Sequence, residues 1–139
     1  MDQRKSSSIP KIGGIILKER SLLVVRKITP GDRPEFIIPG GRQEPGESDT
    51  DTLRRELDEE LGVTLLNATH FGSFDDIAIF ENIPIHMEVY LTRIAGVLSP
   101  QSEIKEYLWI DRNYESHGHK LGSILAKHVI PKLMERGLM

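Results

Sequence analysis

The stretch from Gly41 to Val63 constrains the fold of this chain most strongly, because it joins a glycine-containing loop to a capped acidic helix. Its sequence is GRQEPGESDTDTLRRELDEELGV. Ser48 is a preferred N-cap residue, and the aspartates that follow it suit the positive end of the helix dipole. Gly62 is typical of the position just after a helix. The sequence therefore predicts a helix over Asp49–Leu61.

This helix is expected to pack on a core. Leu53, Leu57 and Leu61 recur at helical spacing and form one apolar face. With 139 residues, the chain is long enough to bury such a core as a single domain. The hydrophobic share of 38% and the charged share of 28% are ordinary for a globular protein and too balanced for a disordered one.

A second face of the same helix carries acids. At about 100° per residue, Glu56, Glu59 and Glu60 fall within one sector of roughly 100°. Carboxylates held together on a rigid element supply the oxygen ligands that Mg²⁺ prefers. The alternative is a solvated acidic face offset by Arg54 and Arg55. Gly40 and Gly41 favour the first interpretation, because a backbone without Cβ atoms can approach a ligand closely.

The rest of the chain predicts a mixture of strands and one further helix around this stretch. Apolar runs predict strands over Lys11–Lys18, Leu22–Arg26, Glu35–Ile38, Ile85–Ile94 and Ile104–Ile110, with one or two more inside Val63–Ile79. Helical spacing predicts a C-terminal helix over Leu121–Arg136, kinked or divided by Pro131. Residues 1–9 are polar and Ser-rich and are expected to form a flexible tail before a domain over 10–139.

Composition excludes several classes of site and partner. The chain has no cysteine, which excludes disulfides, zinc–thiolate sites, iron–sulfur clusters and a cysteine nucleophile. This fits a reducing compartment, and we expect a cytoplasmic protein. No apolar run is long enough to span a bilayer, and the N-terminus lacks a signal-peptide core. A formal net charge of −3 predicts neither a nucleic-acid nor a membrane partner.

The acidic helix and its loop resemble the Nudix box of the Nudix hydrolase family at every defined position. The match runs Gly41, five residues, Glu47, seven residues, then Arg55-Glu56-Leu57-x-Glu59-Glu60-x-Gly62-Val63. It fixes nine positions over 23 residues, so chance agreement is negligible. The preceding segment 36–40, FIIPG, resembles the strand that enters the box. The resemblance implies the Nudix fold, an α/β/α sandwich with a central mixed β-sheet.

The resemblance also implies an activity and a metal. Nudix hydrolases cleave nucleoside diphosphates linked to another group, with Mg²⁺ or Mn²⁺ as cofactor. Metals are needed because the polyanionic substrate repels a hydroxide nucleophile. The implied metal ligands are the Gly41 carbonyl and the carboxylates of Glu56, Glu59, Glu60 and Glu103.

Catalytic roles follow from the same resemblance. In MutT-type members the acid after the box arginine is also the general base, which makes Glu56 the first choice here. Arg55 resembles the arginine that holds this acid by a charge-assisted hydrogen bond. Glu47 resembles the acid that ties the loop to the helix, and its alternative is an exposed helix-start acid without a catalytic part.

A distal acid is expected to join the catalytic residues. Glu103 and Glu106 precede Trp109 by six and three residues. The spacing at Glu103 resembles the MutT-type pattern better, although either residue is also explained as a surface acid.

Three residues are assigned to substrate binding. They are Arg26, Phe36 and Phe80. Arg26 and its neighbour Lys27 end a predicted strand where a phosphate would be in reach, and their alternative is a solvated strand end. A phenylalanine such as Phe80 would stack on a base, and its alternative is core packing.

Elimination among Nudix branches favours a MutT-type pyrophosphohydrolase that converts an NTP or dNTP to NMP and pyrophosphate. The ADP-ribose branch has a proline where this chain has Ile79, and the dinucleoside polyphosphate branch has a tyrosine where it has Phe80 and Glu81. The coenzyme A motif is matched only in fragments. The alternatives are hydrolysis of a nucleotide sugar or another diphosphate derivative, a non-catalytic nucleotide sensor, and a purely structural protein. The oligomeric state stays open, with a homodimer among the options.

Overall fold

The computed structural model describes residues 8–28, 34–77 and 82–139. Their elements follow the order β1 (Ile9–Ile15), β2 (Leu17–Lys18), β3 (Ser21–Lys27), β4 (Gly40–Arg42), α2 (Asp49–Leu61), β5 (Thr64–Ile77), β6 (Pro84–Ala95), β7 (Ile104–Ile110), η1 (Tyr114–His117), η2 (Leu125–Val129) and α3 (Ile130–Glu135). The tail predicted over residues 1–9 falls mostly on residues 1–7, which lie outside the described residues. Each helix of the described ranges is too short or too polar to cross a membrane.

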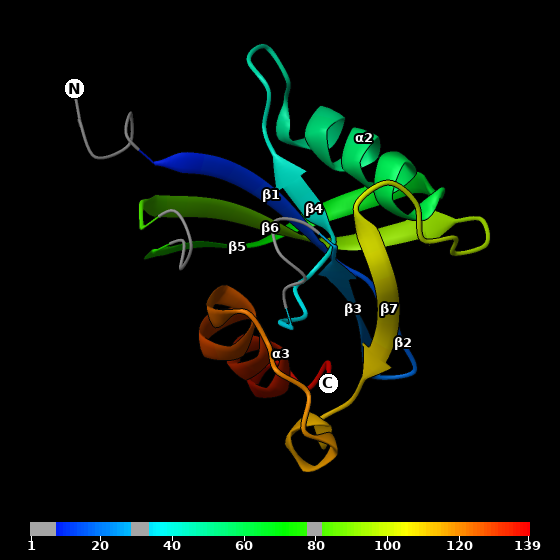
Figure 1. The fold of residues 1–139 in the computed structure, drawn as a ribbon, viewed down its shortest axis with the longest axis vertical. Coiled ribbons are helices and arrows are strands. Elements are labelled where there is room, and N and C mark those ends of the chain that lie inside the picture. The colour runs from blue at the N-terminus through cyan, green and yellow to red at the C-terminus, as the bar shows by residue number, and fades with distance from the viewer. Residues whose placement is uncertain (1–7, 29–33, 78–81) are drawn as a thin grey trace.

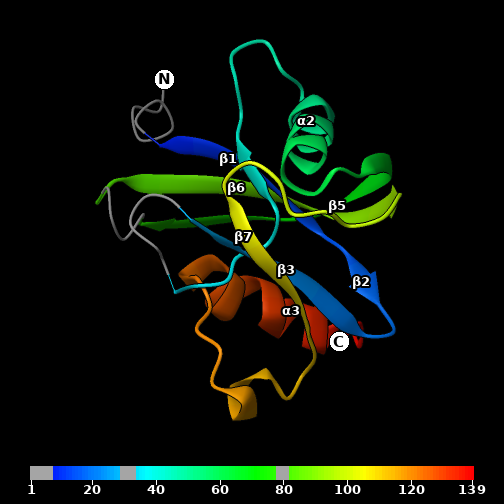
Figure 2. The ribbon, with the colours of Figure 1, turned by 45° about the vertical axis from the view of Figure 1, so that its right-hand side comes forward.

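The strands form two sheets. The larger has the order β4-β1-β6-β5 and is mixed, because β1 and β6 run parallel while its other neighbours are antiparallel. The smaller has the order β2-β3-β7 and is antiparallel. Helix α2 lies on one side of the larger sheet and α3 on the other (Figures 1 and 2). This arrangement confirms the predicted fold with its central mixed sheet.

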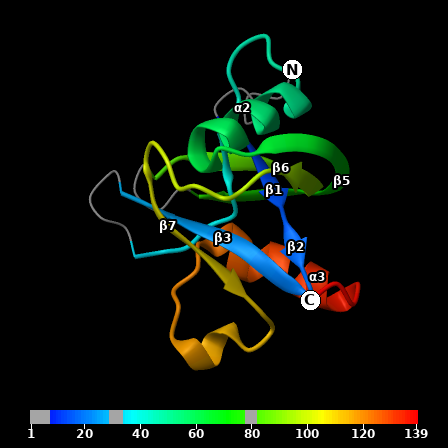
Figure 3. The ribbon, with the colours of Figure 1, turned by 90° about the vertical axis from the view of Figure 1, so that its right-hand side faces the viewer.

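Two apolar cores follow from these layers. Strand β3 contributes to both, because its side chains alternate between faces. Leu22 and Val24 pack with residues of η2 and α3, whereas Leu23 and Val25 pack with the three leucines of α2. All four of these β3 side chains are fully buried. In Figure 3 the paired strands β3 and β7 run between α2 and α3.

Local signals in the sequence predicted α2 correctly. The helix spans Asp49–Leu61 as expected, with Ser48 as its N-cap. The Ser48 hydroxyl accepts a hydrogen bond from the Asp51 amide, and the Asp51 carboxylate accepts one from the Ser48 amide. Gly62 ends the helix with a φ of 65°, a left-handed conformation that favours glycine.

The strand predicted over Glu35–Ile38 is wrong. Phe36 and Ile37 form only isolated bridges, to Leu121 and Val25 respectively. Pro34 and Pro39 bracket the segment and donate no amide hydrogen, so a continuous ladder cannot form there. The segment instead connects the two sheets and leads the chain into Gly40.

Two other predicted elements differ in their bounds. The strand predicted over Lys11–Lys18 is divided at Ile16, so that β1 joins the larger sheet and β2 the smaller. The predicted C-terminal helix is shorter, and five of its residues form the π-helix η2, which ends two residues before Pro131. Proline lacks the amide that an α-helical turn requires, and a wider turn accommodates that loss.

Candidate active site

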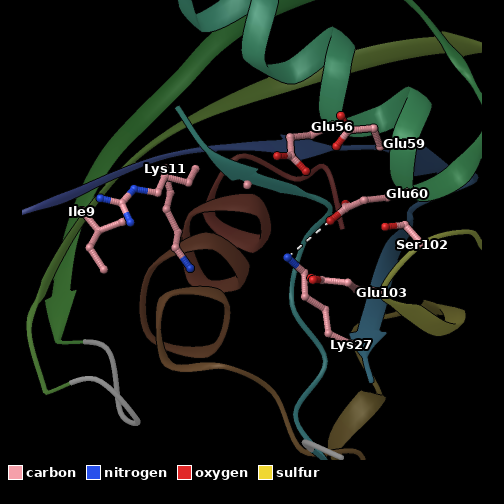
Figure 4. Close-up of a pocket in the computed structure, with 10 residues that line it drawn as sticks. Ile9, Lys11, Lys27, Glu56, Glu59, Glu60, Ser102 and Glu103 are labelled. Carbon is pink, nitrogen blue, oxygen red and sulfur yellow. Dashed lines mark ion pairs between the residues drawn. The ribbon is translucent and has the colours of Figure 1, made fainter. Parts of the chain in front are cut away.

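A pocket of about 400 Å³ lies between the acidic face of α2, the β1–β4 pair and the loop before β7. Its lining residues are Ile9, Lys11, Lys27, Gly41, Arg42, Glu56, Glu59, Glu60, Ser102 and Glu103. Figure 4 shows the three glutamates of α2 on one side of this pocket and Lys11 across from them. The structure therefore brings together all five residues predicted as metal ligands.

Arg55 organises the acids at the start of the box. Its Nε and Nη2 atoms donate to the two carboxylate oxygens of Glu47, each at 2.8 Å, and its Nη1 donates to Glu56 at 3.0 Å. Hydrogen bonds from the Arg55 guanidinium lower the pKa of Glu47 to about 2. Glu47 also accepts from Thr52 and from the Glu44 amide, so it connects the loop to the helix.

Glu56 is half-buried beside Gly41. Burial raises the pKa of its carboxyl group, against the opposing effect of the Arg55 and Lys27 charges. A Cβ atom on Gly41 would lie 2.4 Å from the carboxyl carbon of Glu56. A larger residue at position 41 would therefore displace this carboxylate. Glycine leaves room for the carboxylate directly against the β4 backbone.

Glu60 is the most buried acid of the site, with a relative exposure of 5%. Burial raises its pKa to about 7. The Gly40 amide donates to its Oε1 atom at 3.0 Å, and the Lys27 Nζ lies 3.4 Å from its Oε2 atom. Glu59 is more exposed and lies 3.5 Å from Arg55. The acids are thus held by cations of the chain itself.

The two distal acids point to different places. Glu106 lies opposite Arg26 on the β3–β7 pair and accepts a hydrogen bond from it at 2.7 Å. An irregularity follows, so that Lys27 pairs with Ile104 and one residue of β7 is extra. Such a bulge changes the face on which the next side chains lie. Ile104 consequently packs with the α2 leucines. Glu103, which precedes β7, lines the acidic pocket, whereas Glu106 does not.

Two of the three residues assigned to substrate binding, Arg26 and Phe36, lie outside the pocket. The guanidinium carbon of Arg26 lies 5.9 Å from the centre of the Phe36 ring, and neither residue lines the pocket. Phe36 is 5% exposed and packs in the core beside α3. Phe80 lies outside the described residues. The substrate role of all three stays a prediction.

Sequence reasoning missed Lys11, Arg42 and Ser102. Lys11 and Arg42 are direct partners across the antiparallel β1–β4 pair, next to the partners Ile12 and Gly41. Strand pairing is a long-range property, so no local spacing pointed to this pair of cations. Like charges directly opposite one another weaken a sheet, and an anion bound between Lys11 and Arg42 would offset this repulsion.

The donor set fits a hard divalent cation. It consists of carboxylate oxygens and a backbone carbonyl, the ligands that Mg²⁺ and Mn²⁺ take. Across the ranges that the structure describes, no three His, Asp or Glu side chains form a ready-made metal site. Arg55 and Lys27 contact carboxylate oxygens that a metal would use.

Comparison with known proteins decides the family. A family model described as the NUDIX domain matches residues 8–126. The chain belongs to the Nudix family. It is a Nudix hydrolase, and hydrolases of this family act on nucleoside diphosphate derivatives and generally use divalent metal ions. Comparison with curated proteins gave no match.

Several solved structures resemble this Nudix hydrolase over most of its length. The E. coli ORF135 protein is 25% identical with a TM-score of 0.71, and the match covers 94% of this chain and 89% of that one. A MutT protein from Methanosarcina mazei Go1 is 19% identical with a TM-score of 0.78, covering 94% and 96%. A NUDIX hydrolase from Nitrosomonas europaea is 16% identical with a TM-score of 0.79, covering 92% and 89%.

Proposed function

We propose that this Nudix hydrolase is a pyrophosphohydrolase that requires Mg²⁺ or Mn²⁺ and converts a nucleoside triphosphate to a monophosphate and pyrophosphate. The observation that carries the proposal is the distribution of charge in the pocket. Four carboxylates line it together with three cations, Lys11, Lys27 and Arg42. Acids alone would suit a metal ion, whereas acids and cations together suit a metal-bound polyphosphate chain. We expect it to act in the cytoplasm.

Each part of the pocket has a chemical task in this proposal. Glu56, Glu59, Glu60, Glu103 and the Gly41 carbonyl would hold the metal. A divalent cation bound there would offset phosphate charge and lower the pKa of a water molecule. Lys11, Lys27 and Arg42 would bind the non-bridging phosphate oxygens and orient the chain for attack. The Lys27 contact with Glu60 shows that this ammonium group reaches the acids.

Glu56 is the proposed general base. The oxygen of water forms a bond to phosphorus, the phosphoanhydride P–O bond breaks, and its electron pair leaves with pyrophosphate. The proton released by the water passes to the Glu56 carboxylate. Arg55 holds that carboxylate in place at 3.0 Å.

The two distal acids give a first prediction. Glu103→Gln is expected to lower kcat by about tenfold or more, because Glu103 lines the pocket. Glu106→Gln removes an equal charge from the same segment and is the matched control. We expect the control to have the smaller effect, because Glu106 contacts Arg26 outside the pocket. Rates measured at saturating metal test this, and a larger loss for Glu106→Gln would contradict the assignment.

Metal binding gives a second prediction. A ligand that binds only the native state stabilises it, so Tm should rise with Mg²⁺ or Mn²⁺ concentration. Glu60 is buried and has the neighbouring acid Glu56, so an added cation relieves repulsion there. The rise should be smaller in a Glu59→Gln/Glu60→Gln variant. Thermal unfolding at fixed ionic strength measures both, and equal shifts in the two proteins would mean a nonspecific salt effect.

A substrate screen tests the proposed reaction. Purified protein with Mg²⁺ is given nucleoside triphosphates, dinucleotides and nucleotide sugars, and the products are separated by ion-exchange chromatography. We expect the highest kcat/KM with a triphosphate, and pyrophosphate among the products. Preference for a nucleotide sugar, with two monophosphates released, would overturn the triphosphate assignment. Lack of any turnover would favour the sensor alternative.

A further inference from the structure

A hydrogen bond joins the start of α2 to the larger sheet through two residues that are not defined positions of the Nudix box. Tyr90 of β6 donates its hydroxyl to the Oδ2 atom of Asp49, the first residue of α2, at 2.5 Å. Neither residue occupies a defined position of the box. The Tyr90 ring packs against the core that anchors α2. This hydrogen bond therefore joins the start of the catalytic helix to the centre of the sheet.

Gln43 extends this contact into the loop. Its side-chain amide donates to the other oxygen of Asp49 at 2.9 Å and to the backbone carbonyl of Glu47 at 3.0 Å. Its backbone amide donates to the carbonyl of Pro10 at 2.9 Å. Both carboxylate oxygens of Asp49 are thus engaged, one by the sheet and one by the loop.

The same hydrogen bonds lead to the proposed base. Glu47 receives two hydrogen bonds from Arg55, and Arg55 donates to Glu56. The Arg55–Glu47 pair joins the loop to the helix, and the Nη2 atom of Arg55 also donates to the Arg42 carbonyl of β4 at 3.1 Å. The Gly41 backbone belongs to β4 in the sheet, so the fit of Glu56 over Gly41 depends on the helix position relative to the sheet.

We propose that Tyr90 and Asp49 are positioning residues of this Nudix hydrolase, which hold the start of α2 against the sheet so that Glu56 stays over Gly41. The inference rests on the role proposed for Glu56. Neither residue lines the pocket, so both act through the position of the helix and not through contact with substrate. Tight geometry is needed because a displacement of about 1 Å can cost up to 10²-fold in rate.

Removal of the Tyr90 hydroxyl is the test. Tyr90→Phe is expected to lower kcat by about tenfold, to change KM by less than twofold and to weaken Mn²⁺ binding, measured by electron paramagnetic resonance without substrate. Tyr114→Phe is the matched control, because it also removes a hydroxyl that donates to an acid, Glu115, in η1. The control should keep wild-type kcat and Mn²⁺ affinity. Equal results for the two variants would overturn the proposal.

A double-mutant cycle tests whether Tyr90 and Asp49 act on kcat through one shared contact. Asp49→Ala removes the Tyr90 contact and the Gln43 contact, so it is expected to lower kcat at least as much as Tyr90→Phe, and the double variant should be no worse than Asp49→Ala alone. Additive losses would overturn the proposal. The cycle uses the best substrate of the screen, whatever its class, and Glu56→Gln is measured alongside. Full activity of Glu56→Gln would refute the proposed base, whereas a failed cycle with an inactive Glu56→Gln refutes only the positioning role.

Discussion

Glu56→Gln is expected to lower turnover by roughly 10²-fold or more, the largest effect of any substitution considered for this protein. The amide keeps the shape of the side chain and an oxygen that accepts from Arg55, but it is a poor proton acceptor and a weak metal ligand. The half-buried position beside Gly41 leaves little room for another group to replace it. Single-turnover and steady-state rates on the best substrate measure the loss.

A matched control exists on the same helix. Asp58→Asn also neutralises one carboxylate of α2, but Asp58 is exposed and does not line the pocket. We expect its rate to stay within about twofold of wild type, since surface substitutions usually have small effects. A Glu56→Gln rate close to that of this control would refute the role of Glu56 as general base.

Replacing Gly40 or the adjacent Gly41 by alanine is expected to affect different properties of the protein, its stability in one case and its turnover in the other. At Gly40 the φ is 142°, and a Cβ atom would lie 2.1 Å from the Ile12 carbonyl oxygen. Backbone cannot yield as a side chain can, so Gly40→Ala should destabilise the fold by about 3 kcal/mol or more. At Gly41 the atoms nearest to an added Cβ atom belong to the end of the Glu56 side chain. Gly41→Ala should keep its stability and lose about tenfold or more in turnover, because Glu56 is displaced.

Denaturant unfolding and kcat distinguish the two outcomes. The expected pattern is a large loss of stability for Gly40→Ala and a loss of turnover at nearly native stability for Gly41→Ala. A stable and fully active Gly41→Ala would show that the contact between Glu56 and the β4 backbone has no part in the reaction. A Gly40→Ala variant of native stability would contradict the close packing of β4 against β1.

The parts of the site that sequence predicted are those that depend on local signals. The bounds of α2 follow from its cap residues and its leucine spacing, all within a few residues of each helix end. The acids on its second face then follow from helical geometry alone. Their convergence with Glu103 required the resemblance to a family, because the two segments lie more than 40 positions apart in the chain.

The parts that sequence did not predict depend on long-range pairing. Lys11 and Arg42 become neighbours only when β1 pairs with β4. The irregularity in the β3–β7 pair places Ile104 on the α2 side of β7, which alternation along an ideal strand does not anticipate. Phe36 was predicted within a strand, whereas the flanking prolines prevent a ladder there.

The most direct test of the account is product analysis of a nucleoside triphosphate reaction with wild-type protein and Glu56→Gln, each with and without Mg²⁺. We expect nucleoside monophosphate and pyrophosphate from wild-type protein with Mg²⁺, a rate at least roughly 10²-fold lower from Glu56→Gln, and no turnover in a chelator. Release of inorganic phosphate with a nucleoside diphosphate, or an equal rate with and without Mg²⁺, would contradict it.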